Sequence, residues 1–190
     1  ELLERGTLSD ADRTSILADM RAEVDELADL SAELSALAID NRTTEEPESI
    51  DLSDIAHEVA TRASRRSGAP VTVHSTPGTT VVARPNQLER ALSNLVDNAI
   101  KFTNDGSEIE IHIGSFRVEV RDKGIGITDA DKPLVFDRFY RATATRSMPG
   151  SGLGLSIVSQ FASDHNASAY VLDNAGGGAI VGLQFPIPAA

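Results

Sequence analysis

The sequence predicts an α+β fold: a two-layer α/β sandwich preceded by a long helix of the kind found in helical bundles. Three observations support this class. Helical segments and alternating, strand-like segments are interleaved after residue 45, turn residues join the strand-like segments, and a regular apolar stripe precedes them all. Helices mixed with mostly antiparallel strands bury their apolar faces by packing in two layers.

The N-terminal stripe is the first element. Its apolar residues recur at intervals of three and four, and the residues between them are mainly acidic: the stripe consists of Ile16, Met20, Val24, Leu27, Leu30, Leu34 and Leu37. So narrow a stripe favours a coiled coil or four-helix bundle, although an ordinary amphipathic helix packed on its own domain stays open. Pro47 and the polar residues before it end the helix. We therefore predict one domain over residues 1–44 and another over 45–190.

The second part begins with a helix, 52–66, which we expect Ser53 to cap. Two short β-type runs, 71–74 and 79–82, flank Pro77-Gly78 and predict a hairpin. A second helix, 85–101, follows, with Pro85 well placed in its first turn.

The strongest hairpin signal comes next, because residues 108–113 and 117–121 alternate strictly around Gly114-Ser115. The remaining predictions are a short helix at 129–136, a polar loop at 141–150, a helix at 152–165, and two strands, 169–172 and 180–185, joined through three glycines.

Composition allows a real core and excludes several classes of protein. Of 190 residues, 41% are apolar but only 4% aromatic, so the core must consist mainly of Leu, Ile, Val and Ala. The chain has no Cys, which excludes disulfides, thiol chemistry and Cys-based zinc sites. No apolar run approaches the roughly 20 residues of a membrane span, and no signal peptide is visible, so we expect a soluble chain.

The net charge of −12 is unevenly distributed. Residues 1–58 hold 17 acidic against four basic side chains, whereas residues 59–190 hold 12 against 13. This asymmetry indicates two parts with different roles. Nucleic acid is excluded as a partner, because no basic face is available to neutralise its phosphates.

Two segments place oxygen donors where a nucleotide needs them. In Asn94-Leu-Val-Asp-Asn98-Ala-Ile-Lys101 the three numbered residues share one helical face, and amide oxygens suit Mg²⁺ while Lys101 suits a phosphate. Asp122-Lys-Gly124-Ile-Gly126 follows a strand directly, so its carboxylate can accept a hydrogen bond from an exocyclic amine such as that of adenine. Taken singly, these segments are better explained by a solvated helix face and a tight turn.

Two further segments offer anion contacts. Gly150-Ser-Gly-Leu-Gly154 opens a helix, whose free N–H groups favour anions. Phe136-Asp-Arg138-Phe139-Tyr-Arg141 precedes the polar loop: its two Phe residues are spaced to anchor the base of the loop, and its two Arg side chains are suited to phosphates. A flexible hinge and a helix end with solvated Arg are the structural alternatives.

Taken in order, the four segments resemble the N, G1, F and G2 boxes of the catalytic domain of bacterial sensor histidine kinases, members of the GHKL ATPase superfamily. The resemblance spans roughly residues 50–188, and the sequences of the four boxes are most similar to those of MprB-type actinobacterial sensors. It implies the GHKL (Bergerat) ATP-binding fold, with ATP between the N-box helix and a flexible lid at 141–150. The N-terminal stripe is similar to the second helix of the family's dimerisation hairpin.

The resemblance also implies a role for each residue. Asn98 would ligate Mg²⁺, Asn94 would support the phosphate side, and Asp122 would bind adenine. The nucleotide-binding residues implied are Asn94, Asn98, Lys101, Asp122, Gly124, Gly126, Ile127, Arg138, Arg141, Gly150, Ser151, Gly152, Leu153, Gly154 and Leu155.

No phosphoacceptor histidine is expected in this chain, since the family places it early in a helix that would precede Glu1. His57-Glu58-Val59 is similar to the start of the acceptor box but lacks its continuation. The resemblance implies ATP and Mg²⁺ as cofactors, a response-regulator receiver domain as partner, and a homodimer through the N-terminal bundle. It further implies a cytoplasmic location, with membrane attachment only through segments outside the chain.

The sequence departs from the family at two points. Ala179 stands where a Thr is common near adenine, and His165-Asn166-Ala replaces the usual His-Gly-Gly, although Asn166 can adopt a left-handed cap. Two other functions stay open: another GHKL enzyme, such as an anti-sigma-factor Ser kinase or an ATP-driven clamp, and a non-catalytic nucleotide-binding interaction module.

Overall fold

The computed structural model describes residues 12–14, 16–17, 20, 24, 45–76, 78–103, 106–145, 148 and 150–187. The chain divides into two compact units. One consists of residues 1–43 with 143–151, and the other of residues 44–142 with 152–190. In the first unit the described residues between 12 and 24 are helical, and Thr143–Thr145 forms a 3-10 turn. The remainder of the predicted long helix lies outside the described residues.

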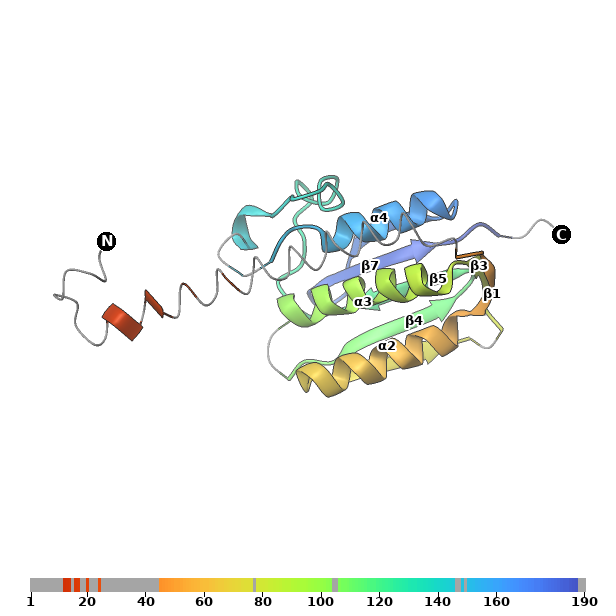
Figure 1. Cartoon of the computed structure of the whole chain (residues 1–190), viewed down its shortest axis with the longest axis horizontal. Coiled ribbons are helices and arrows are strands. Elements are labelled where there is room, and N and C mark those ends of the chain that lie inside the picture. Colours follow the sequence, from red (N-terminus) through yellow and green to blue (C-terminus); the bar gives the residue numbers. More distant parts are fainter. Residues whose placement is uncertain are drawn as a thin grey trace. The chain divides into compact units, whose positions relative to one another are not determined.

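The second unit is a two-layer sandwich, which confirms the predicted fold class (Figure 1). Its main sheet has the strand order β2-β4-β5-β7-β6, in which β2 and β4 are parallel and all other neighbours antiparallel. The strands are β2 (Val71–Ser75), β4 (Ile109–Gly114), β5 (Arg117–Arg121), β6 (Ser168–Asp173) and β7 (Ala179–Gln184).

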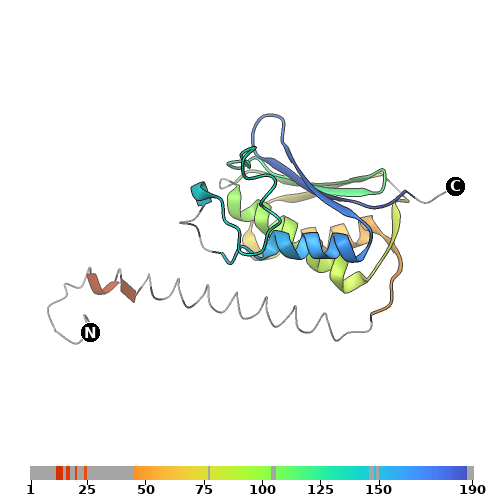
Figure 2. The ribbon, with the colours of Figure 1, turned by 90° about the horizontal axis from the view of Figure 1, so that it is seen from above.

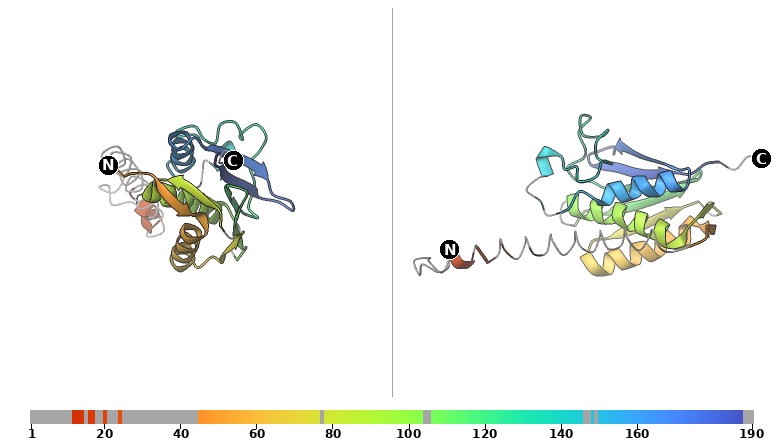
Figure 3. Two further views of the ribbon diagram at one scale, coloured as in Figure 1. Left: turned by 90° about the vertical axis from the view of Figure 1, so that its right-hand side faces the viewer. Right: turned by 45° about the horizontal axis from the view of Figure 1, so that its top comes forward.

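Three helices cover one face of this sheet, as the views in Figures 2 and 3 show. They are α2 (Leu52–Ser67), α3 (Pro85–Phe102) and α4 (Gly154–Asp164). The core lies between the layers and consists of aliphatic side chains, with Phe161 and Phe185 as its buried aromatic residues among those described. None of the described helices combines the length and the apolar character needed to span a membrane.

The alternating residues of β4 and β5 pair as the predicted hairpin. Ile109, Ile111 and Ile113 are buried against the helices, and the residues between them face away. The turn falls on Ser115 and Phe116, one residue later than predicted, and both adopt left-handed backbone angles (φ 53° and 59°) that match the twist of a tight hairpin.

The predicted hairpin of 71–74 with 79–82 is wrong. β2 pairs with β4 in the main sheet, whereas β3 (Thr80–Ala83) pairs antiparallel with β1 (Glu48–Asp51) in a separate two-stranded sheet. The residues of β1 are mostly polar, so their sequence does not signal a strand. The two β-type runs therefore each have a distant partner and do not pair with each other.

Helix ends differ from prediction in smaller ways. Asp51, rather than Ser53, caps α2, because the Asp51 carboxylate accepts a hydrogen bond from the Ser53 backbone N–H at 2.8 Å. Pro85 does occupy the first turn of α3. The predicted helix at 129–136 is a series of turns. Pro133 lies in its middle and has no N–H to continue a helical ladder.

Candidate functional site

The polar face of α3 has the arrangement that its spacing predicts. Asn94, Asn98 and Lys101 are all half-buried, whereas the opposite face supplies the buried apolar residues of the helix. The Asn98 side chain makes no hydrogen bond with any described residue, so its amide oxygen is available to a ligand. Lys101 Nζ lies 5.0 Å from the centre of the Phe102 ring, a cation–π contact at the end of the helix.

Asp122 is the most constrained group of the site. It follows β5 directly and is only 7% exposed. Its Oδ1 accepts hydrogen bonds from the backbone N–H of Gly124 at 2.8 Å and of Ala179 at 3.2 Å. Its other carboxylate oxygen, Oδ2, bonds to no described residue. The carboxylate is thus held by one oxygen and offers the other.

Burial dominates the electrostatics of this carboxylate. Loss of water raises the pKa of Asp122 above its ordinary value, and the two backbone N–H donors offset this rise only in part. A buried acceptor of this kind interacts strongly with a hydrogen-bond donor, because little water competes for it.

Close backbone packing holds the segment around Asp122. A methyl group at Gly124 would lie 2.0 Å from the Phe102 carbonyl oxygen, so only glycine lets this segment approach the end of α3. Ile125 N–H donates to the same carbonyl at 3.3 Å. Gly126 lies beside Gly178, where a methyl group would stand 3.3 Å from the Gly178 carbonyl oxygen. Three distant segments therefore meet at this point.

Sequence reasoning missed two of the groups that hold Asp122. Asn174 Nδ2 donates to the Asp122 carbonyl oxygen at 2.7 Å, and the Ala179 N–H bonds its carboxylate. The sequence distinguishes Ala179 only as a replacement for a Thr. A backbone donor carries no side-chain signal, so this contact could not have been found from the sequence.

The segment before the polar loop is only partly as predicted. Phe136 packs against the core, but Phe139 is 61% exposed and has a left-handed φ of 63°, so only one of the two rings anchors the loop base. Tyr140 adds an unforeseen anchor, since its hydroxyl donates to Asp131 Oδ1 at 2.6 Å. Arg138 is exposed and makes no ion pair with any described residue.

The glycine segment leads into α4, which begins at Gly154, two residues later than predicted. A methyl group at Gly154 would lie 3.4 Å from Asn94 Oδ1, so the start of α4 packs beside the polar face of α3. Among the described residues, no side chain caps this helix end. Leu153 is buried and Leu155 packs on the core, which fixes the first turn. The N–H groups at the start of a helix favour an anion.

Gly152 joins this helix end to the preceding segment. Its carbonyl oxygen accepts a hydrogen bond from the Phe139 N–H at 3.0 Å, and a methyl group would lie 2.8 Å from the Tyr140 carbonyl oxygen. Gly150 and Ser151 belong to the first unit. Arg141 is half-buried, as is Ile127, which packs on the core.

Past α4, Asn166 adopts the left-handed conformation that its sequence allowed (φ 54°). The buried His165 has a structural role. Its Nδ1 donates to the Phe161 carbonyl oxygen at 2.9 Å, and its Nε2 accepts the Arg84 N–H at 3.1 Å. These two bonds tie α4 to the start of α3.

A family model described as histidine kinase-, DNA gyrase B-, and HSP90-like ATPase matches residues 83–189. The chain belongs to this ATPase family. The matched residues include α3, Asp122 and both glycine segments.

Curated relatives show which members of this family the chain is similar to. The chain is 33% identical over 183 residues to the signal transduction histidine-protein kinase/phosphatase MprB of Mycobacterium sp. (strain KMS), a match that covers 94% of this chain and 36% of the relative. It is 34% identical over 179 residues to the MprB of Mycobacterium leprae, with 92% and 34% covered. The chain thus spans about a third of the length of these curated relatives.

Solved structures show the same relationship to sensor histidine kinases. The mycobacterial sensor histidine kinase MprB superposes with a TM-score of 0.64 at 33% identity, covering 72% of this chain and 95% of that one. The ATP binding domain of PrrB from Mycobacterium tuberculosis gives 0.62 at 25% identity, with 76% and 99% covered. The predicted relationship to MprB-type sensor histidine kinases, and the predicted GHKL fold, are confirmed.

Proposed function

We propose that this chain is the catalytic part of a sensor histidine kinase, which binds Mg-ATP and donates the γ-phosphoryl group to a histidine outside the chain. The observation that supports this most directly is the buried carboxylate of Asp122, which is held through Oδ1 and has Oδ2 available. A carboxylate presented in this way suits the exocyclic amine of adenine, with Gly124, Gly126 and Ile127 beside the base.

We assign the binding of the nucleotide's phosphates to residues of α3 and α4. Asn98, whose amide oxygen has no partner among the described residues, has the donor chemistry that suits Mg²⁺. When bound, Mg²⁺ neutralises negative charge on the phosphate oxygens. Asn94, which packs beside Gly154 at the start of α4, supports this side, and Lys101 supplies positive charge.

Arg138 and Arg141 are assigned to the same phosphates, as are the N–H groups from Gly150 to Leu155 that precede and begin α4. These groups bind and orient the phosphates and neutralise their charge. None of them performs covalent chemistry. Phosphoryl transfer depends mainly on positioning and electrostatic stabilisation, so a site built of such groups is sufficient.

We assign the histidine that accepts the phosphoryl group to a preceding helix. His57 is an unsuitable acceptor because it lies on α2 and its Nδ1 is hydrogen-bonded to the Ser53 carbonyl oxygen at 2.6 Å. We assign residues 1–44 to the dimerisation hairpin and 45–190 to the ATP-binding domain. Exposed Leu17, Met20 and Val24 on the first suit partner helices in a homodimer.

The intact parent is then a membrane-anchored sensor, and this chain is part of its cytoplasmic portion. The phosphorylated histidine of this parent passes the phosphoryl group to the aspartate of a response-regulator receiver domain. The relationship to MprB-type sensors supports all three points.

Radiolabelled ATP tests the proposal. The chain alone is expected to gain no acid-labile label, whereas a supplied dimerisation hairpin from an MprB-type sensor is expected to gain acid-labile, base-stable label on its histidine. Label on the isolated chain, or transfer to a serine-containing partner in place of the hairpin, contradicts the assignment.

A further inference from the structure

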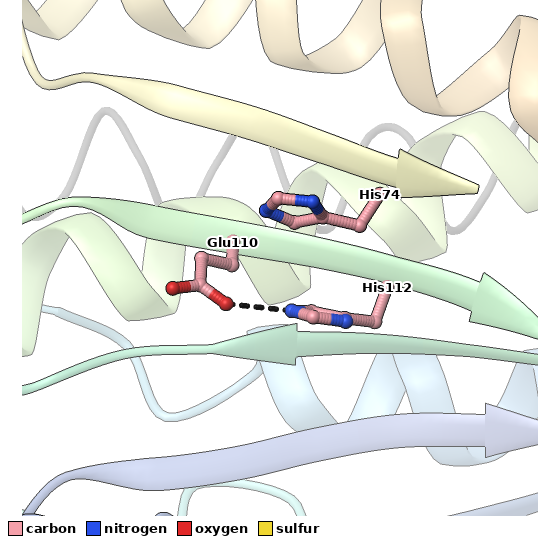
Figure 4. A group of neighbouring side chains, drawn as sticks. All are labelled: His74, Glu110 and His112. Carbon is pink, nitrogen blue, oxygen red and sulfur yellow. Dashed lines mark hydrogen bonds and ion pairs between the residues drawn. The ribbon is translucent and has the colours of Figure 1, made fainter.

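A group of ionisable side chains lies on the other face of the sheet, which no described helix covers. It comprises His74 on β2 and Glu110 and His112 on β4 (Figure 4). Alternate residues of a strand point to the same face, which places Glu110 beside His112. In the parallel β2–β4 pair, His74 is in register with His112. The backbone pairing of two strands therefore fixes the spacing of all three side chains.

The side chains already converge. Glu110 Oε2 lies 2.6 Å from His112 Nε2, and the His74 and His112 rings stack with their centres 4.7 Å apart and their planes 30° apart. One ligand atom from each of the three residues falls within 4.8 Å of the others. His74 is exposed and the other two are half-buried, so water has access to the group.

We propose that His74, Glu110 and His112 bind a zinc-class divalent cation, with water completing the coordination. Two imidazoles and one carboxylate form a donor set typical of Zn²⁺, with distances of about 2.0–2.2 Å to the metal. In a tetrahedral site such ligand atoms lie roughly 3.3–3.5 Å apart. The ligand atoms already lie within 4.8 Å of one another, and rotation of the side chains can bring them to this spacing because the strand positions are set.

Neighbouring groups are consistent with a site limited to these three residues. Glu119 is in register with His112 on β5, but its carboxylate is occupied by Arg117, Arg121 and Tyr170. Nitrogen donors make the group a poor ligand set for Mg²⁺, which prefers oxygen. The proposed site is therefore distinct in chemistry from the nucleotide-bound Mg²⁺.

The consequence of binding is a metal link between strands. β2 is an edge strand of the main sheet, and β4 is its only neighbour there among the strands that the structure describes. A cation shared between His74 and the two β4 residues joins this edge to the sheet, and it stabilises the folded state because the unfolded chain has no such site.

The test is a calorimetric titration of the untagged 190-residue chain with ZnCl₂ in the absence of nucleotide, followed by thermal melts with and without zinc. We expect one Zn²⁺ per chain and a higher melting temperature. His74→Ala and His112→Ala are each expected to weaken binding at least tenfold and to abolish the rise in melting temperature. The matched control is His57→Ala, which removes an exposed histidine on α2 and is expected to change affinity less than twofold.

His74 is exposed, so its alanine variant keeps the fold and remains informative even if another variant unfolds. Absence of zinc binding overturns the proposal. So does binding that His74→Ala leaves unchanged, or that His57→Ala weakens equally. A parallel titration with MgCl₂ is expected to give no melting shift that depends on His74.

Discussion

Replacing Gly178 with alanine tests whether the turn between β6 and β7 positions Asp122. A methyl group at Gly178 would lie 2.1 Å from the Asp122 carbonyl oxygen and 2.8 Å from its Oδ1, where real contacts are no closer than 3.0 Å. The backbone must therefore shift by about 1 Å, and such overpacking typically costs about 1–3 kcal/mol. Gly178 also has φ +90°, where alanine adds roughly 1–2 kcal/mol of strain.

Gly177 is the matched control. It has φ +108° in the same turn, but a methyl group there meets nothing within 4 Å. Gly177→Ala is therefore expected to cost about 1–2 kcal/mol from backbone strain alone, and Gly178→Ala about 2–5 kcal/mol. Urea denaturation of both variants measures the difference.

Nucleotide affinity gives the second readout of this pair. A carboxylate displaced by about 1 Å loses a charge-assisted hydrogen bond worth about 1.5–3 kcal/mol, which weakens Mg-ADP binding about 10- to 150-fold. Gly177→Ala is expected to bind as the wild type does. Equal unfolding free energies for the two variants, or unchanged affinity in folded Gly178→Ala, would refute the reasoning.

Two further predictions concern pH. Asp122 has a folded-state pKa raised chiefly by burial, so its ionisation disfavours folding once the pH exceeds that pKa. Asp122→Asn is therefore expected to be more stable than the wild type at pH 7 in urea denaturation and to lose this advantage below pH 3.8; a less stable variant at pH 7 would contradict the assignment. Burial opposes ionisation of Glu119 as well, but hydrogen bonds from Arg121 and Tyr170, together with the positive charges of Arg117 and Arg121, lower the Glu119 pKa below 4.5. Its contribution to stability is therefore present above pH 4.5 and lost as the pH falls through the folded-state pKa, so Glu119→Gln should cost about 1–3 kcal/mol at pH 7 and progressively less in acid; a cost that does not depend on pH would count against this.

Local signals predicted most of the elements of the second unit. The β4–β5 hairpin follows from strict alternation around a short turn, and Pro85 marks the start of α3 because its missing N–H costs nothing there. Pairing between distant strands was not predictable in this way. β2 has the alternation of a hairpin strand, yet its partner is β4, and no local pattern distinguishes the two arrangements.

The candidate site shows the same contrast between features with a local signal and features that depend on distant residues. Asn94, Asn98 and Lys101 follow from helical periodicity, and Asp122 from its place after a strand. What holds Asp122 comes from far along the chain: the Ala179 N–H and Asn174 are more than 50 residues away. The histidine group on the sheet is similar, since His74 and His112 become neighbours only through strand pairing.

Calorimetry with Mg-ADP on the wild type and on Asp122→Asn tests the central claim most directly. The asparagine keeps an acceptor oxygen for the two backbone N–H groups but places an NH₂ donor where Oδ2 faced the ligand. The account predicts one nucleotide per wild-type chain and at least tenfold weaker binding by the variant, with exposed Asp54→Asn on α2 as an unaffected control. Equal affinity in all three proteins, or no binding by the wild type, would contradict it.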